Sequence, residues 1–277
     1  RPTLVTGATD VMLDRECFEL EFDDGTSVVA DAGHQWLTST RASRQAATPP
    51  AGYVFNRESP FSRDQRHLSE LPSVKTTRLI ADTLRVEPEM RANHAVALTK
   101  PLDLPPVDLP IDPYVLGVWL GDGNSRAPQI TTADPEIVEL VLAAGYPCRK
   151  IVGLYRYSLA SPRDRSGGRT RATGLGVELQ ALDLIRNKHI PESYARASES
   201  QRWALLQGLM DTDGTVNKTG RCMFAVTSRR LAEDARELIH SLGIKAHMAT
   251  KVVKGRTAES STCYSVGFST SEPVFRL

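Results

Sequence analysis

The sequence predicts an α+β fold, with a β-rich N-terminal part followed by a C-terminal part of two αββαββ-type repeats. Residues Cys17–Phe22 alternate apolar and acidic side chains, which is the periodicity of a strand with one buried face. Two apolar runs, Val115–Gly123 and Leu205–Gly214, suit buried helices, and each ends in Asp-Gly. Because similar elements follow both runs, we expect the C-terminal part to be one pseudo-two-fold domain.

Composition limits the classes of protein to which this chain can belong. Its 277 residues suggest one large domain or two ordinary ones, and 40% hydrophobic residues suffice for packed cores. No apolar run approaches the roughly 20 residues of a membrane span, and no signal peptide is visible. Four cysteines without a CxxC pair argue against zinc and disulfide frameworks and fit a reducing cytoplasm. Because the chain begins at Arg1 rather than Met, we expect a piece of a longer protein or a processed product.

Charge is distributed unevenly along the chain, although the net charge is only +1. Residues 1–40 contain eight acidic residues and two arginines, whereas residues 145–175 contain seven Lys or Arg and one Asp. This asymmetry predicts a separate domain with a surface that faces a polyanion.

The N-terminal part begins with an expected β-hairpin. Phe18, Leu20 and Phe22 share one face of the first strand, Asp24-Gly25 is a turn signal, and Ser27–Ala30 is the returning strand. Residues 41–75 are polar and proline-containing, so we expect a long loop or insertion there. Ser73–Val86 predicts a short helix-turn element capped by Thr76 or Thr77, and His94–Leu98 predicts a strand.

A proline-rich segment divides the two parts. Pro101–Pro113 contains five prolines and predicts a linker, which closes with Asp112-Pro113 as a helix start. We therefore expect a first domain at residues 1–105 and a second at residues 106–277, with repeats at 112–195 and 198–277.

The order of elements after the two apolar runs indicates an internal repeat. After the first run we expect a strand at Gln129–Thr132 and a helix from Asp134 that ends at Gly145. After the second we expect a strand at Cys222–Thr227, a helix at Leu231–Leu242 that ends at Gly243, and strands at Lys245–Val253 and Cys263–Phe268. The offsets between matching positions drift from 91 for the Asp pair to 98 for the final glycines, which indicates loop insertions on a shared plan.

The two apolar runs also carry a candidate metal site. Small residues lie four apart in both, at Gly117/Gly121 and Gly208/Thr212, and so share one helix face. Small side chains let two helix backbones approach closely, which would bring Asp122 and Asp213 side by side. Because closely paired carboxylates are unfavourable without a cation, we expect a divalent ion, with Mg²⁺ as the oxygen-liking default.

These runs resemble the paired motifs of LAGLIDADG homing endonucleases. The second, Leu206–Gly214, is close to the family pattern, whereas the first departs from it because Leu120 replaces an acid. The resemblance implies metal-dependent cleavage of double-stranded DNA at a long asymmetric site by a monomer. It also implies Asp122 and Asp213 as metal-binding acids, the carbonyls of Gly121 and Thr212 as further ligands, and an assisting lysine, for which Lys251 is the candidate.

We expect the strands that follow each motif to bind DNA, because a β-ribbon fits the major groove and basic side chains contact phosphates. Basic and tyrosine residues are interleaved there, more densely in the first repeat than in the second; a solvated charged surface is the alternative interpretation. The candidates are Arg149, Lys150, Tyr155, Arg156, Arg163, Arg165, Arg169, Arg171, Lys245, Lys254 and Arg256.

The segment Asp31–Thr38 resembles the histidine block of inteins, which have a β-rich Hint splicing fold. His34 matches the histidine that activates the N-terminal scissile bond, a role that suits an imidazole. Trp36 resembles the tryptophan of inteins that begin splicing from an internal cysteine, as in actinobacterial replicative helicases. The resemblance implies host-protein exteins as partners in a longer precursor.

Other features indicate that this chain would be a fragment of such an element. It has no terminal His-Asn pair, and the late Cys263 falls in an expected repeat strand. We therefore expect part of a Hint domain and most of a nuclease, without either splice junction and unable to splice alone.

Two further interpretations stay open from the sequence. A LAGLIDADG-type regulator could bind DNA without cleaving it, although such a protein gains nothing from two adjacent acids. A free-standing or intron-encoded nuclease would leave His34 and Trp36 unexplained.

Overall fold

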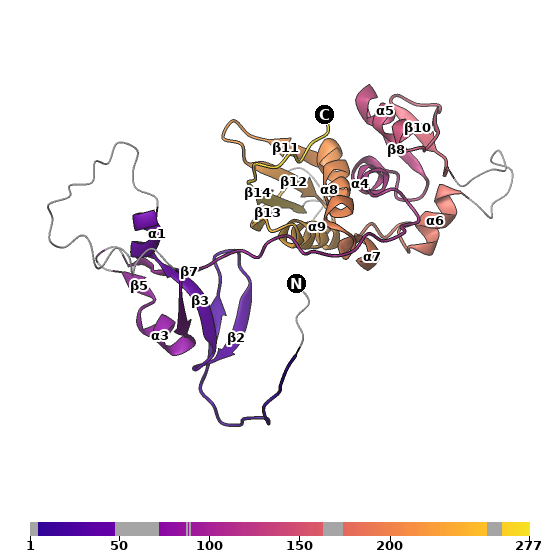
Figure 1. Ribbon diagram of the computed structural model, residues 1–277. Coiled ribbons are helices and arrows are strands. Elements are labelled where there is room, and N and C mark those ends of the chain that lie inside the picture. Colours follow the sequence, from indigo (N-terminus) through magenta and orange to yellow (C-terminus); the bar gives the residue numbers. More distant parts are fainter. Residues whose placement is uncertain (1–4, 48–71, 87, 89, 163–173, 254–261) are drawn as a thin grey trace. The chain divides into compact units, whose positions relative to one another are not determined.

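The computed structural model describes residues 5–47, 72–86, 88, 90–162, 174–253 and 262–277. The chain divides into two compact units, residues 2–98 and residues 99–277 (Figure 1). The two units divide between Leu98 and Thr99. The sequence-based expectation placed the division after residue 105.

The first unit begins with the predicted hairpin. Strands β1 (Cys17–Glu21) and β2 (Ser27–Asp31) pair in antiparallel fashion from Cys17–Asp31 to Glu21–Ser27. Gly25 has a φ of 82°, and the Asp24 carboxylate accepts a hydrogen bond of 2.9 Å from the Thr26 amide. The turn therefore depends on glycine at a left-handed position and on an Asp side chain.

A three-stranded antiparallel sheet follows, in the order β4-β3-β7. Its strands are β3 (Gln35–Thr40), β4 (Ser73–Thr76) and β7 (His94–Val96), accompanied by helices α1 (Arg41–Ala47) and α3 (Thr77–Asp82) and by the short pair β5 (Arg85–Val86) and β6 (Arg91–Ala92). Of the two expected caps of α3, the structure selects Thr76, whose hydroxyl accepts from the Leu79 amide.

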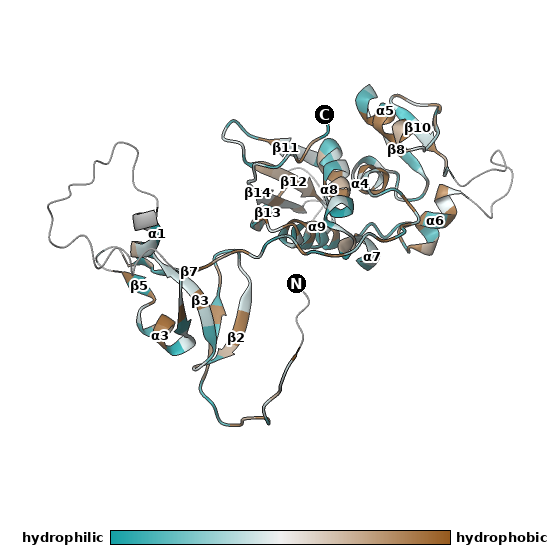
Figure 2. Cartoon of the chain, in the orientation of Figure 1, coloured by the Kyte–Doolittle hydropathy of each residue, from teal (hydrophilic) through white to brown (hydrophobic). Residues whose placement is uncertain are grey.

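Few hydrophobic side chains are buried in this unit. Among its described residues, only Ala30 and Ile80 belong to the buried hydrophobic set. The cross-strand pair Leu37 and Val74 is 58% and 60% exposed, and hydrophobic colour lies on β2 and α3 (Figure 2). The first unit therefore has little core of its own within the described residues.

The second unit alternates helices and antiparallel strands. Its first half contains α4 (Pro113–Asp122), β8 (Gln129–Thr131), α5 (Pro135–Ala143), β9 (Cys148–Lys150), β10 (Arg156–Leu159), α6 (Leu175–Ala181) and α7 (Glu192–Ala195). Its second half contains α8 (Glu199–Asp213), β11 (Gly214–Val216), β12 (Cys222–Val226), α9 (Arg229–Ser241), β13 (Ala246–Val252) and β14 (Thr262–Phe268). The sheets have the orders β8-β10-β9 and β11-β12-β14-β13.

Helix boundaries follow the predicted capping signals. Asp112 and Asp134 cap α4 and α5, each with proline at the start of the helix. Gly145 and Gly243, which follow α5 and α9, have φ values of 88° and 77°. Both glycines therefore adopt the left-handed conformation that ends a helix.

The two motif helices, α4 and α8, pack against each other through glycine (Figure 1). A Cβ atom on Gly117 would lie 2.3 Å from the Leu205 carbonyl oxygen, and one on Gly208 would lie 2.2 Å from that of Tyr114. Larger side chains at these positions would force the backbones apart. The predicted close approach is confirmed.

The first half differs from the predicted αββαββ order. Where β11 follows α8, α4 is followed only by an isolated bridge between Gly123 and Ile130. The intervening chain is a tight turn in which Asn124 accepts from Ala127 and donates to Gln129. Too few residues separate α4 from β8 for a longer strand. The mixed helix-and-sheet class is as predicted, and the pseudo-two-fold relation stays a prediction.

The proline-rich segment is packed against the second unit, contrary to the predicted linker. The Gln201 side chain exchanges two hydrogen bonds with the backbone of Val107, and the Tyr194 hydroxyl does so with Ile111. Leu102 donates to the Ser241 carbonyl and accepts from the buried Arg202 guanidinium. Prolines remove backbone donors but leave these carbonyls and amides available for side chains.

Within the described part of the chain, none of the helices has both the length and the apolar character that crossing a membrane requires.

Candidate functional site

Two carboxylates lie at the paired ends of α4 and α8. Asp122 and Asp213 are the last residues of these helices, and both are half-buried. Burial raises the pKa of each, and the nearby Asp122 carboxylate raises the pKa of Asp213 further. A position that disfavours two negative charges is suited to a cation.

A lysine that the sequence did not single out reaches the same place. The Lys188 ammonium donates a 2.9 Å hydrogen bond to the Gly121 carbonyl and lies 5.3 Å from the centre of the Trp119 ring. Burial lowers its pKa to about 8, and the attraction of Asp213 and Asp122 opposes that shift. Lys188, Asp122 and Asp213 thus form one electrostatic cluster.

The backbone on both sides of Lys188 is tied to α9. The Asn187 side chain accepts from the Arg230 guanidinium at 3.0 Å, and the Ile190 amide donates to the Asp234 carboxylate at 2.9 Å. These contacts hold the segment between α4 and α9 and direct the lysine side chain toward the end of α4.

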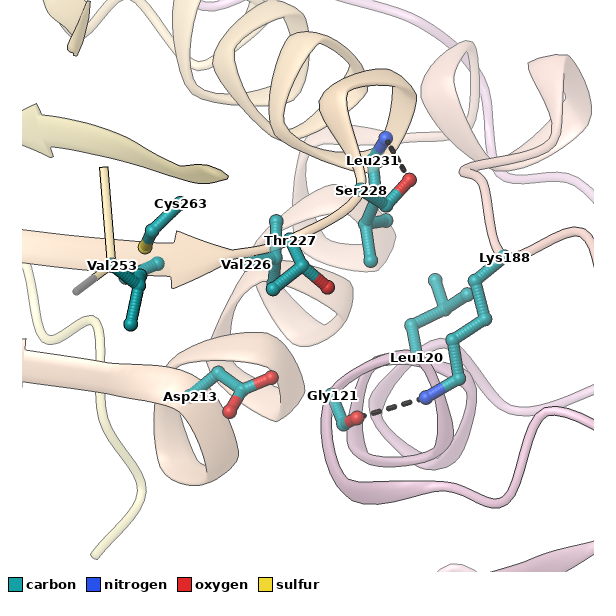
Figure 3. A pocket seen from close by; sticks show the side chains of 11 residues that line it. Leu120, Gly121, Lys188, Asp213, Val226, Thr227, Ser228, Leu231, Val253 and Cys263 are labelled. Carbon is teal, nitrogen blue, oxygen red and sulfur yellow. Dashed lines mark hydrogen bonds between the residues drawn. The ribbon is translucent and has the colours of Figure 1, made fainter. Parts of the chain in front are cut away.

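Lys188 and Asp213 of this cluster line a pocket of about 430 Å³. Figure 3 shows Lys188 extending to Gly121 at the end of α4, with the Asp213 carboxylate at the end of α8 opposite. Val226 and Thr227 are drawn above the Asp213 carboxylate, with Val253 and Cys263 on one side of them and Ser228 on the side toward Lys188. The site is therefore open and mixed in polarity rather than enclosed.

The other acid of the second motif, Asp211, is buried and hydrogen-bonded to the surrounding structure. It accepts a 2.8 Å hydrogen bond from the Tyr114 hydroxyl of α4 and one of 2.9 Å from the Arg276 amide. The Arg276 guanidinium also lies 4.2 Å from the centre of the Tyr114 ring. Leu120 stands at the matching position of the first motif and is buried in the hydrophobic core, so the Asp122/Asp213 pair forms without a second acid there.

The residues present fit a hard divalent cation. Two carboxylates and the Gly121 carbonyl supply oxygen donors, which Mg²⁺ and Mn²⁺ prefer. The Thr212 hydroxyl is engaged with the carbonyls of Gly208 and Leu209 in its own helix. Among the described residues, no group of three or more His, Cys, Asp or Glu forms a metal cluster, so the two aspartates would need backbone or water ligands.

Lys251, the lysine named from sequence, lies on β13 opposite Cys263. Cross-strand partners share a sheet face, so Lys251 is on the same face as a residue of the pocket lining. Its side chain is exposed and does not line the pocket, whereas Lys188 does. The structure therefore points to Lys188 as the lysine of this site.

The strand registers place the expected DNA-binding residues on different faces of the first sheet. Arg149 and Arg156 lie on the sheet face opposite the buried Ile130, and Arg156 donates to Gln129 at 3.2 Å. Lys150 pairs with Tyr157, which pairs with Ile130, so Lys150 lies on the core-side face. Tyr155 occupies a turn with a φ of 60°, and Lys245 precedes β13. The remaining candidates, Arg163, Arg165, Arg169, Arg171, Lys254 and Arg256, lie outside the described residues.

The second sheet presents an arginine that was not expected. A Cβ atom on Gly267 would lie 2.9 Å from the Arg221 guanidinium, so this side chain extends across β14. It lines a pocket with Asn217, Met223 and His247, on the face away from the core residue Phe224. Because side chains alternate along β12, knowing that Phe224 is buried would place Arg221 on the opposite face.

In the first unit, His34 and Trp36 lie together. Their rings are in edge contact with centres 4.8 Å apart, and the Trp36 indole donates a 3.0 Å hydrogen bond to the buried Thr77 hydroxyl. The Thr77 amide donates to the His34 carbonyl at 3.0 Å. Strand β3 and the start of α3 therefore position both side chains.

Lys188 was missed because no local pattern distinguishes it. It lies in an irregular stretch between α6 and α7, with neither helical nor strand periodicity. Tertiary contacts bring it to the acids, among them those of Asn187 and Ile190 with α9 and the hydrogen bond from the Arg186 amide to the Ser125 carbonyl.

Comparisons with known proteins bear on this arrangement. Residues 200–276 match the family model described as a LAGLIDADG-like domain. The chain is 45% identical over 278 aligned residues, its full length, to a replicative DNA helicase DnaB of Mycobacterium intracellulare, of which it covers 43%. A shorter match, 66% identical over 38 residues, is to the DnaB helicase of Mycobacterium leprae, covering 14% of this chain and 6% of that protein. The chain thus spans less than half the length of these curated relatives.

Solved structures with a similar arrangement include variants of the homing endonuclease I-DmoI. One is 14% identical with a TM-score of 0.38, covering 60% of this chain and 92% of the other. Another, solved with its target DNA in the presence of Mn, is 15% identical with a TM-score of 0.37, covering 57% of this chain and 86% of the other.

The sequence matches support the predicted resemblance: residues 200–276 match the LAGLIDADG-like family model, and the chain is similar over its whole length to a segment of a mycobacterial replicative DNA helicase.

Proposed function

We propose that residues 99–277 form a divalent-metal-dependent endonuclease that cleaves double-stranded DNA at a specific site. The observation that carries this proposal is the pair of half-buried carboxylates, Asp122 and Asp213, at the ends of two helices packed through glycine. Holding two like charges together costs free energy, and binding a cation offsets that cost.

In this proposal Asp122 and Asp213 hold the metal, with the carbonyls of Gly121 and Thr212 as further ligands. Bound there, Mg²⁺ would neutralise phosphate charge and activate a water molecule. Lys188 adds a preorganised donor beside the acids, where negative charge on the phosphate would be stabilised. The open pocket would admit a backbone phosphate from the sheet side.

The outward faces of the two sheets are the proposed DNA-binding surface. Arg149 and Arg156 in the first sheet and Arg221 in the second would contact phosphates or base edges, releasing counterions. Lys150 is a weaker candidate because it lies on the core-side face.

We further propose that the chain is part of an intein inserted in a replicative DNA helicase. The full-length similarity to a segment of a mycobacterial helicase and the His34–Trp36 pair support this proposal. In the longer precursor, His34 would act at the N-terminal splice junction and the flanking host segments would be the partners. Splicing and helicase activity belong to that longer protein.

The test of the nuclease is cleavage of a plasmid that carries the uninterrupted insertion site of the host helicase gene. With Mg²⁺ we expect a double-strand cut at one position, lost on chelation and in both Asp122→Asn and Asp213→Asn. Asp134→Asn, which keeps a helix cap far from the acids in sequence, is the matched control and should cut normally. Specific binding without cutting, unchanged in the variants, would instead indicate a DNA-binding protein.

A further inference from the structure

The Lys188 ammonium is hydrogen-bonded to the Gly121 carbonyl oxygen, which is one of the proposed metal ligands. Gly121 is in the last turn of α4, where carbonyls have no partner within the helix and the helix dipole favours positive charge. Its carbonyl accepts the 2.9 Å hydrogen bond from Lys188, whose charge is attracted by both Asp122 and Asp213. One cation therefore already serves this cluster of oxygens.

The residues on both sides of Lys188 are held in place by hydrogen bonds, which fixes the position of the lysine. Asn187 and Ile190 are each hydrogen-bonded to α9, through Arg230 and Asp234. The side chain crosses the Trp119 ring, which stabilises a cation on its face. The ammonium is thus held at the ends of α4 and α8 by contacts that do not depend on a metal.

We propose that Lys188 is the internal counter-cation of the metal-free site, and that it gives up the Gly121 carbonyl when a divalent ion binds. This inference rests on the proposed metal site and assigns Lys188 a positioning role. In the absence of metal the lysine would keep the two acidic helix ends together. It would also compete with the metal and so raise the concentration of divalent ion needed for binding.

The two effects have opposite signs and can be separated. Removing the positive charge should leave two unneutralised carboxylates, which lowers stability without metal and strengthens attraction for a divalent ion. Even at the dielectric constant of water, the repulsion between a unit charge and a divalent ion about 4 Å apart corresponds to a change in metal affinity of about tenfold or more. A side chain that only fills space would lower stability equally with and without metal.

The experiment uses the full chain and Mn²⁺ as the probe, with free Mn²⁺ measured by electron paramagnetic resonance. We expect Lys188→Met to bind Mn²⁺ about tenfold more tightly than the wild type. Lys188→Gln, which keeps a donor for the Gly121 carbonyl, should also bind more tightly, whereas Lys188→Arg should resemble the wild type. Lys218→Met, at an exposed position in the turn between β11 and β12, is the control and should bind unchanged.

Thermal melting of the same proteins supplies the second readout. In EDTA, Lys188→Met should melt below the wild type, and saturating Mn²⁺ should raise its melting temperature by more than it raises that of the wild type. Equal or weaker Mn²⁺ binding by folded Lys188→Met, or failure of both neutral variants to fold even with Mn²⁺, would overturn the inference. If wild-type protein binds no Mn²⁺, or Asp122→Asn and Asp213→Asn bind it as well as the wild type, the metal site itself fails.

Discussion

At the scale of single residues, the neighbouring groups determine what a side chain does in this protein. Asp211 and Asp213 are two positions apart, yet one is hydrogen-bonded to Tyr114 and the Arg276 amide while the other faces Lys188 and a pocket. Two acids of one motif therefore separate into one that is hydrogen-bonded in the core and one that lines a pocket. The environment, rather than the residue type, distinguishes them.

Asp213→Asn should stabilise the metal-free protein. Burial and the Asp122 charge raise the pKa of Asp213, so its ionised form is disfavoured in the folded state at neutral pH. Neutralising it should therefore raise the melting temperature in EDTA. Calorimetry with Asp134→Asn as the control checks this, and an unchanged or lowered melting temperature would contradict it.

His94 should make the stability of the first unit sensitive to acid. Its ring nitrogens meet the hydroxyls of Thr38 and Thr83, and burial, followed by the Lys75 charge, lowers its pKa from 6.5. Because the unfolded chain binds the proton more readily, stability is complete above pH 6.5 and falls as the pH drops below that value.

The measurement is the denaturation midpoint of wild type and His94→Gln between pH 5 and 8, about the range over which histidine titrates. The variant should lose part of the acid dependence. An identical pH profile for both proteins would show that another group is responsible.

At the scale of elements, close packing and capping define the site. Helices α4 and α8 approach through Gly117 and Gly208, and this approach brings their terminal acids together. The proline-rich segment before α4 is fastened to the second unit by side chains of Gln201, Arg202 and Tyr194. Interactions between elements, rather than propensity within one, hold this arrangement.

Gly117→Ala should be destabilising because its Cβ would meet backbone atoms of Leu205 and Gly208. Overpacking of this kind costs about 1–3 kcal/mol. Gly176→Ala in α6 is the control, because the nearest atoms there are at an ordinary 3.7 Å, and alanine should stabilise that helix by roughly 0.5–1 kcal/mol. Chemical denaturation of both variants tests the contrast, which equal midpoints would refute.

Arg202→Met should loosen the proline-rich segment. The buried guanidinium donates to the carbonyls of Ala197, Leu102 and Ser241, and leaving these acceptors unpaired costs about 2–3 kcal/mol. Arg196→Met removes only an exposed ion pair with Glu237, worth about 1 kcal/mol or less. Proteolysis between residues 99 and 112 should increase in the first variant only.

At the scale of the whole molecule, burial is concentrated in one unit. Apart from Ala30 and Ile80, every buried hydrophobic side chain among the described residues lies between Ile111 and Val274. The β-rich first unit exposes Leu37 and Val74 on its sheet. The second unit therefore contains most of the apolar burial that stabilises folding.

Amide hydrogen exchange should reflect this division. We expect α4, α8 and α9 to be strongly protected, because their amides open only on unfolding of the second unit, and β1, β2 and β7 to exchange much faster. Mass spectrometry of exchanged peptides from the full chain measures this difference. Comparable protection in both units would show that the first unit has stability beyond its visible core.

Agreement between the predicted and the observed elements varies along the chain. Turns and caps at Asp24-Gly25, Asp112 and Gly243 were predicted correctly because each depends on a local residue with a specific conformation or hydrogen bond. The shortened first repeat and the bound proline-rich segment were missed, since both depend on contacts with distant parts of the chain.

The sequence alone determined the motif helices, their glycine faces and the acids Asp122 and Asp213, because spacing along a helix fixes which side chains share a face. It could not determine that Lys188 joins them, or which of Arg149 and Lys150 faces outward. The lysine is placed by hydrogen bonds from its neighbours to α9, and the two basic residues are sorted by strand register. A one-residue shift in register exchanges the faces, and only tertiary packing fixes the register.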